Sequence, residues 1–166
     1  MNVVFDPTAF DNMKVVFEGA VYDLDLSGEA IVTQRHDYID LATMSRLYSI
    51  RLTLDENSST YADIRLEATI EQLAAELLNQ ANQFRIGAFV KVLFTWKQEE
   101  KSASYKKLIT SLWGEERSYE YRTIFSSHED PKEEIIIDFQ RIVTEDMMDD
   151  LLEMLHHVVK TLQKLY

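Results

Sequence analysis

Hydrophobic and polar positions follow two different periods along this chain, and each period predicts one kind of element. A two-residue alternation is typical of a strand with one buried face. Its clearest case is IGAFVKVLFTWK, in which every second residue from Ile86 to Trp96 is apolar. Alternation or β-rich composition predicts strands at 14–26, 29–35, 45–54, 86–97, 105–113, 117–127 and 134–143. Ser27-Gly28 predicts a hairpin turn between the first two of these strands.

A spacing of three to four residues between apolar positions predicts two helices. The first covers residues 69–84, where Thr69 and Gln72 have capping-box spacing ahead of the apolar run. The second covers residues 144–166 and carries an apolar stripe along its length. Residues 104–113 leave two interpretations open, a strand or a short third helix.

The order of these elements is strands, helix, strands, helix, with short connections between neighbouring strands. It predicts an α+β fold in which antiparallel meanders of about seven strands carry the two helices on the sheet. The chain has only four Gly and two Pro and no linker rich in them, so we expect a single domain over 1–166. The halves 1–85 and 86–166 share the element order without a sequence repeat, which leaves a duplication open.

The second predicted helix contains Glu153, His156 and His157, a spacing that di-iron sites use. Such a site needs a second Glu-x-x-His, and neither of the other two histidines has an acid three residues before it. Both helix histidines also fall outside the apolar stripe, so pairing with Glu153 on a solvated helix face explains them. We therefore predict no metal and no cofactor. Only a weak surface cation site at Asp149, Glu153 and His156 stays open.

Charge changes the expected partners. The net charge is −12 and the isoelectric point about 4.7, and most of the acidity lies in residues 1–83, which hold 14 Asp/Glu against five Lys/Arg. Such a surface repels phosphate backbones and anionic lipid and attracts basic proteins. We expect a basic protein partner, no nucleic acid and no membrane, with a homodimer left open. No leader-like or membrane-spanning stretch is visible, so we expect a cytoplasmic protein.

Reactive residues are scarce. The chain has no cysteine, which excludes disulfides, thiolate metal sites and cysteine nucleophiles. Ser127-His128-Glu129-Asp130 has the residue types of a triad, but neighbours in sequence rarely form one, and a polar loop is the better interpretation. The four glycines are scattered, so no phosphate-binding loop is predicted. We expect a protein that is not an enzyme and keep an enzyme of unknown type as a third hypothesis.

The first hypothesis is an acidic interaction protein, like immunity, inhibitor or adaptor proteins. Two groups of residues are its candidate contacts. Asp23 and Asp25 share one face of a predicted strand, where they could serve acid/base work, hold a cation or contact a basic partner. An edge strand guarded by charge explains them more simply. The outer face of the first predicted helix carries mainly amide side chains. Amides cost less free energy to desolvate than charged groups, so this face suits an interface. Its candidate residues are Gln72, Asn79, Gln80 and Gln83.

The alternative hypothesis is a protein with a pocket for a small molecule, formed by a curved sheet that the C-terminal helix closes. Its candidate lining consists of five aromatic residues: Phe94, Trp96, Tyr119, Tyr121 and Phe125. The basic and aromatic stretch 105–122 also has the composition of a single-strand nucleic-acid reader. Its tyrosines alternate as in a strand that faces the core, so we interpret them as core residues.

Overall fold

The computed structural model describes residues 8–77 and 86–166. Its elements follow in the order α1 (Thr8–Ser27), β1 (Ile31–Asp40), β2 (Ser45–Thr53), β3 (Tyr61–Ala68), α2 (Ile70–Leu77), β4 (Ala88–Lys97), α3 (Ser102–Trp113), β5 (Ser118–Ile124), β6 (Lys132–Val143), the 3-10 turn η1 (Glu145–Met147) and α4 (Met148–Leu165). The predicted α+β class is confirmed, and the described residues form six strands and four helices in place of about seven and two.

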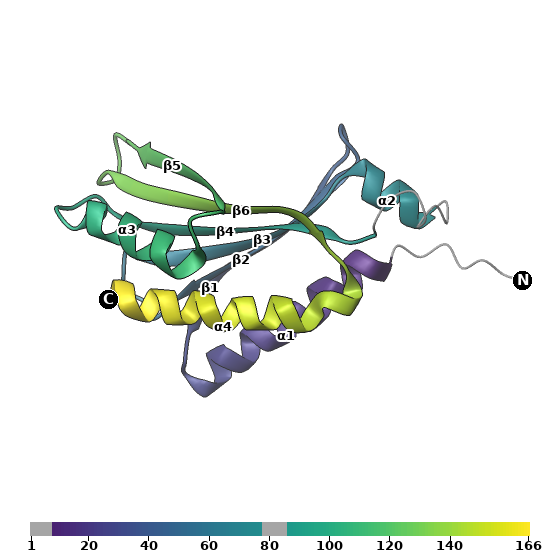
Figure 1. Ribbon diagram of the computed structural model, residues 1–166, viewed down its shortest axis with the longest axis horizontal. Helices are drawn as coiled ribbons and strands as arrows, with labels where there is room; N and C mark the ends of the chain where they lie inside the picture. The colour runs from purple at the N-terminus through teal and green to yellow at the C-terminus, as the bar shows by residue number, and fades with distance from the viewer. Residues whose placement is uncertain (1–7, 78–85) are drawn as a thin grey trace, which may run out of the picture.

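All strand pairs are antiparallel, and the strands lie in the order β1-β2-β3-β4-β6-β5. Figure 1 shows α1, α3 and α4 on one face of this sheet and α2 at the end where β3 stops. Alternation along each strand supplies the buried face. Paired residues Ile50, Ile64, Val92 and Ile137 form one row across four strands, and all four are fully buried. Burying side chains of this size stabilises the fold by about 2 kcal/mol each.

The predicted strand 14–26 is wrong, because these residues belong to α1. Val15 and Val16 and the alternation that follows favour a strand locally. The helical stripe extends beyond that window, through the buried residues Phe10, Met13, Phe17, Val21 and Leu24. This apolar stripe packs the helix against the sheet. The packing outweighs the weak β-propensity of the segment. Gly28, at φ +80°, therefore joins a helix to a strand and not two strands of a hairpin.

Two further assignments change. Residues 105–113 form most of α3, so the helical interpretation is confirmed and the strand is wrong. Strand β3 was not predicted, although Ala62, Ile64 and Leu66 alternate with charged residues. Its charged side chains lie on the face without helices, where Arg51 of β2 forms an ion pair with Asp63 at 2.8 Å. In the described part of the chain no helix is both long and apolar enough to cross a bilayer.

Candidate functional site

Exposed large apolar side chains are most frequent in the segment from α1 to the turn after β1. Among the described residues, twelve large apolar side chains are exposed, and seven of them belong to α1, β1 and the turn after β1. These seven are Val15, Val16, Leu26, Tyr38, Ile39, Leu41 and Met44. We call the area formed by residues 8–44 the α1–β1 surface.

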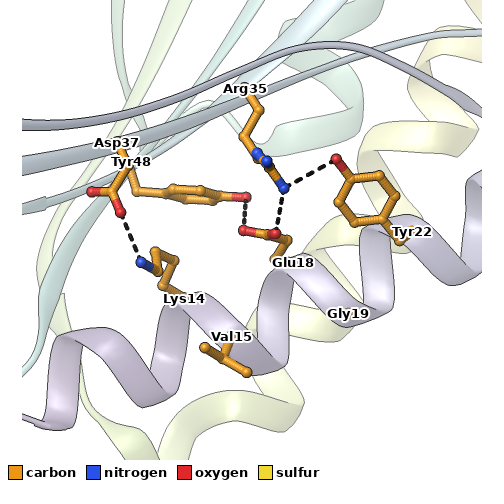
Figure 2. A pocket seen from close by; sticks show the side chains of 8 residues that line it. All are labelled: Lys14, Val15, Glu18, Gly19, Tyr22, Arg35, Asp37 and Tyr48. Carbon is orange, nitrogen blue, oxygen red and sulfur yellow. Dashed lines mark hydrogen bonds and ion pairs between the residues drawn. The ribbon is translucent and has the colours of Figure 1, made fainter.

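A hollow of about 490 Å³ opens on this surface between α1 and the strands β1 and β2. Figure 2 shows side chains of α1 reaching up to side chains of the two strands across it. Its lining consists of Lys14, Val15, Glu18, Gly19, Tyr22, Arg35, Asp37 and Tyr48. Gly19 leaves the α1 side open, because a Cβ built there meets no atom within 4 Å.

The carboxylate of Glu18 is the centre of one polar group in the hollow. Tyr48 donates its hydroxyl proton to Glu18 Oε2 at 2.9 Å, and Arg35 donates to Oε1 at 2.7 Å (Figure 2). Arg35 also donates to the Tyr22 hydroxyl at 3.3 Å. Burial, reinforced by the Glu18 carboxylate, raises the pKa of Tyr48 far above its ordinary value. Tyr48 is therefore a fixed hydrogen-bond donor and not an acid that titrates near neutral pH.

Asp37 is the centre of a second group. It lies 2.7 Å from Lys14 Nζ and 3.1 Å from Arg46 Nη2, and Arg46 Nη1 lies 2.7 Å from Asp11. Burial acts to raise the pKa of Asp37, but hydrogen bonds from Lys14 and Arg46 outweigh it and lower that pKa. The cations and carboxylates of both groups are thus matched to one another. The network fastens the edge strand β1 to α1 and leaves none of its carboxylates free as a general base.

An ordered turn presents the apolar residues that follow β1. Asp40 Oδ1 accepts hydrogen bonds from the backbone N–H groups of Ala42 and Thr43 at 2.9 and 3.3 Å. These bonds hold the turn, and Met44 takes a positive φ of 54°. Leu41 and Met44 remain 79% and 54% exposed. Exposing apolar side chains to water costs free energy in the unbound protein. A structured turn that keeps them exposed is typical of a contact site.

The surface is also acidic. Residues 8–44 hold seven Asp/Glu against two Lys/Arg, and acids remain in excess when Arg46, which pairs with Asp11 and Asp37, is counted with them. The candidate residue Asp25 accepts a hydrogen bond from the Val32 N–H at 2.7 Å, so its carboxylate links the end of α1 to β1. Asp23 is exposed, one turn before Leu26 on the outer side of α1. The two aspartates therefore lie on a helix, and the prediction that placed them on an edge strand is wrong.

The amide face is described only in part. Gln72 is buried, and its Oε1 accepts hydrogen bonds from Thr69 N at 2.7 Å and Thr69 Oγ1 at 2.6 Å. The first of these is one of the two bonds of the predicted capping box, from the glutamine side chain back to the N-cap N–H, and the Gln72 side chain is thus used within the protein. Asn79, Gln80 and Gln83 lie outside the described residues.

The five aromatic candidates for a pocket lie in different surroundings. Phe94 and Trp96 are fully buried in the core between the sheet and α3, Tyr119 is half-buried, and Tyr121 and Phe125 are exposed. The structure does not bring them together in one hollow. A different hollow, of about 480 Å³, lies between α3, β6 and α4. Its lining is Leu112, Trp113, Arg117, Phe139, Arg141, Asp150, Glu153, Met154 and His157.

The two helix histidines differ in environment. His156 is exposed, as predicted. His157 is half-buried, its ring centre lies 4.4 Å from that of Trp113, and its Nε2–H donates to Leu112 O at 2.9 Å. The prediction that both are solvated is therefore wrong for His157. Within residues 8–77 and 86–166 no group of three or more His, Cys, Asp or Glu side chains is placed to hold a metal ion.

Sequence reasoning missed the hollow of Figure 2, because its two sides come from α1, which was predicted as a strand, and from β1, which was predicted only to residue 35. The four-residue spacing of Lys14, Glu18 and Tyr22 was the available signal, since it places them on one side of a helix. Comparison with protein-family models, with curated proteins and with solved structures finds no significant similarity.

Proposed function

We propose that this is a non-enzymatic binding protein, whose α1–β1 surface holds a basic and partly apolar segment of another protein. The observation that carries the proposal is that residues 8–44 hold seven of the twelve large apolar side chains that are exposed in the described part of the chain. The acidic excess of the same residues gives the partner's expected charge. The hollow beside β1 gives partner side chains a recess to enter. This role is of the immunity, inhibitor or adaptor kind.

Site-specific photocrosslinking in the native host tests the proposal. A photoreactive amino acid replaces Val15 or Leu41 on the α1–β1 surface. In a matched control it replaces Phe125, which is 74% exposed beyond β5 at the other edge of the sheet. We expect a discrete crosslinked species carrying a basic protein from the first two positions and none from the third. Crosslinks of equal yield from Phe125, or acidic proteins in every adduct, would contradict the proposal.

A second candidate function is small-molecule binding in the hollow between α3, β6 and α4. Its volume of about 480 Å³ is within the range of ligand pockets, and Trp113 and Phe139 give it aromatic walls. Native mass spectrometry of protein purified from its host tests this candidate. A defined added mass that is lost on replacing Phe139 with Ala would support it. Protein of the bare chain mass, with an unchanged Trp fluorescence spectrum in the variant, would count against it.

A further inference from the structure

Strand β1 forms one edge of the sheet. It is ten residues long, and in the described part of the chain only β2 pairs with it. From Gln34 to Asp40 the pairing with β2 is continuous, after one irregularity near its start. Edge strands are usually blunted by Pro, Lys, short length, charged side chains or bulges. Strand β1 has no Pro and no Lys and is long, and its charged residues Arg35 and Asp37 are held in ion pairs within the chain. Every second residue of such a strand directs its N–H and C=O away from the sheet.

Both flanks of β1 offer places for side chains of an added strand. On the helix side, Arg35 and Asp37 line the hollow of Figure 2 and Ile39 is exposed. On the opposite side, the rings of His36 and Tyr38 stack with their centres 5.3 Å apart. Tyr38 stays 53% exposed despite that contact. Side chains of an extended segment alternate between two such flanks.

The other edge of the sheet serves as an internal comparison. Strand β5 has seven residues, and α3 lies beside it on the helix face (Figure 1). Residues 101–124, which contain both, hold five Lys/Arg against three Asp/Glu. A basic segment is therefore repelled at β5 and attracted at β1, where acids exceed bases. The two edges offer the same backbone groups and differ in the sign of their surrounding charge.

We propose that the partner binds by adding an extended segment to β1 as a seventh strand, in which lysine or arginine alternates with apolar residues. This inference rests on the proposed function and specifies its binding mode. Backbone hydrogen bonds to the open edge supply part of the affinity. Apolar side chains of the segment contact Val15 and Ile39, and its basic side chains meet the acids of the α1–β1 surface.

Hydrogen exchange measured by NMR tests the strand addition. The probe is a short, end-blocked peptide of alternating lysine and valine, added to the isotope-labelled full chain. We expect alternate amides of β1 to exchange at least about tenfold more slowly with the peptide present, and amides of β5 to keep their rates. A peptide of alternating glutamate and valine is the control for charge. The lysine peptide with all backbone nitrogens methylated is the control for hydrogen bonding, and both should protect β1 less.

Two variants of the protein test whether the peptide binds beside β1 and not elsewhere. Gly19→Lys adds a cation beside the hollow, and Ser111→Lys adds one at an exposed position of α3. We expect the first to weaken peptide binding about tenfold and the second to leave it within about twofold.

Three results would overturn the strand addition. Peptide binding that shifts side-chain signals of α1 without slowing β1 amides contradicts it and leaves the proposed function standing. Equal protection of β5, or no binding of the lysine peptide at all, also contradicts it. The proposed function fails separately, when the crosslinks from Val15 and Leu41 find no basic protein.

Discussion

Gly87 lies where β4 begins beside the end of β6, and the structure leaves no room there for a side chain. A Cβ on Gly87 would overlap the carbonyl oxygen of Val143, so the backbone of one strand would have to move. Gly19 is the opposite case, since it lies on an exposed face of α1 with open space around it. The two glycines therefore predict opposite effects of the same substitution.

We expect Gly87→Ala to lower the free energy of unfolding by about 3 kcal/mol, because overpacking against backbone forces a shift. Gly19→Ala should raise it by about 0.5–1 kcal/mol, because alanine favours the helix. Urea unfolding of both variants beside the parent checks the pair. A neutral Gly87→Ala would mean that the β4–β6 junction is looser than the structure has it.

Glu133 predicts a pH dependence. Its carboxylate is buried on β6, 2.8 Å from Lys106 Nζ, and accepts a hydrogen bond from Gln98 Nε2 at 3.1 Å. Lys106 lowers the pKa of Glu133, although burial acts in the opposite direction. A carboxylate with a lowered folded-state pKa stabilises the fold above its unfolded-state pKa. That contribution is lost as the pH falls through the folded-state pKa.

We expect Glu133→Gln to cost about 1–3 kcal/mol at pH 7, and the difference from the parent to shrink from about pH 4.5 downwards. Urea unfolding across the acid range measures it. Glu120→Gln on the exposed part of β5 is the control and should cost less than about 0.5 kcal/mol. A difference that stays constant into acid would show that the charge of Glu133 is not what stabilises the fold.

At the scale of elements, α3 and α4 are joined by a buried hydrogen bond. Trp113 Nε1–H donates to Thr161 Oγ1 at 3.1 Å, and the Thr161 hydroxyl donates to His157 O at 2.7 Å. Thr161 is fully buried. We expect Thr161→Val to cost about 1–3 kcal/mol, because it leaves the indole N–H without an acceptor, and Thr161→Ser to cost less. Faster exchange of the Trp113 indole proton in the valine variant, seen by NMR, would identify the cause.

In the β1–β2 turn, substitutions should change the affinity for the partner without changing the free energy of unfolding. Leu41 and Met44 are exposed, so the double replacement Leu41→Ser and Met44→Ser should change the free energy of unfolding by less than about 1 kcal/mol. The same change should weaken partner binding at least about tenfold. Calorimetry with the crosslinked partner, once isolated, measures both. Unchanged affinity would remove the turn from the α1–β1 surface.

At the scale of the whole molecule, charge is distributed unevenly. Residues 1–83 carry a net charge of −9 and residues 84–166 a net charge of −3. Within residues 8–44 seven acidic residues face only two cations, Lys14 and Arg35, so an excess of negative charge remains after both cations have formed ion pairs. Attraction to a basic partner should therefore be long-ranged and sensitive to salt. Raising NaCl from about 0.1 M to about 1 M should slow association and weaken binding. An association rate that ignores salt would contradict a charge-steered complex.

The fold class was predictable because the hydrophobic periodicity of β4, β6 and α4 is complete within one continuous segment of each. In β4, Ala88 to Trp96 alternate, and the alternation alone identifies the buried face. Much of the candidate site was not predictable. The exposure of Val15 and Ile39 depends on which segments pack against them, and no local pattern of apolar residues records that.

The sequence by itself determined the composition, the acidic excess, the absence of cysteine and the periods of most elements, because these depend only on residues near one another. Only the tertiary structure decided that residues 14–26 form a helix, that Thr161 and Gln72 are buried, and that β1 is an open edge beside a hollow. The physical reason is the sequence separation of the residues that interact. Periodicity is a property of neighbours in the chain, whereas burial and edges arise when distant segments compete for the same apolar surface.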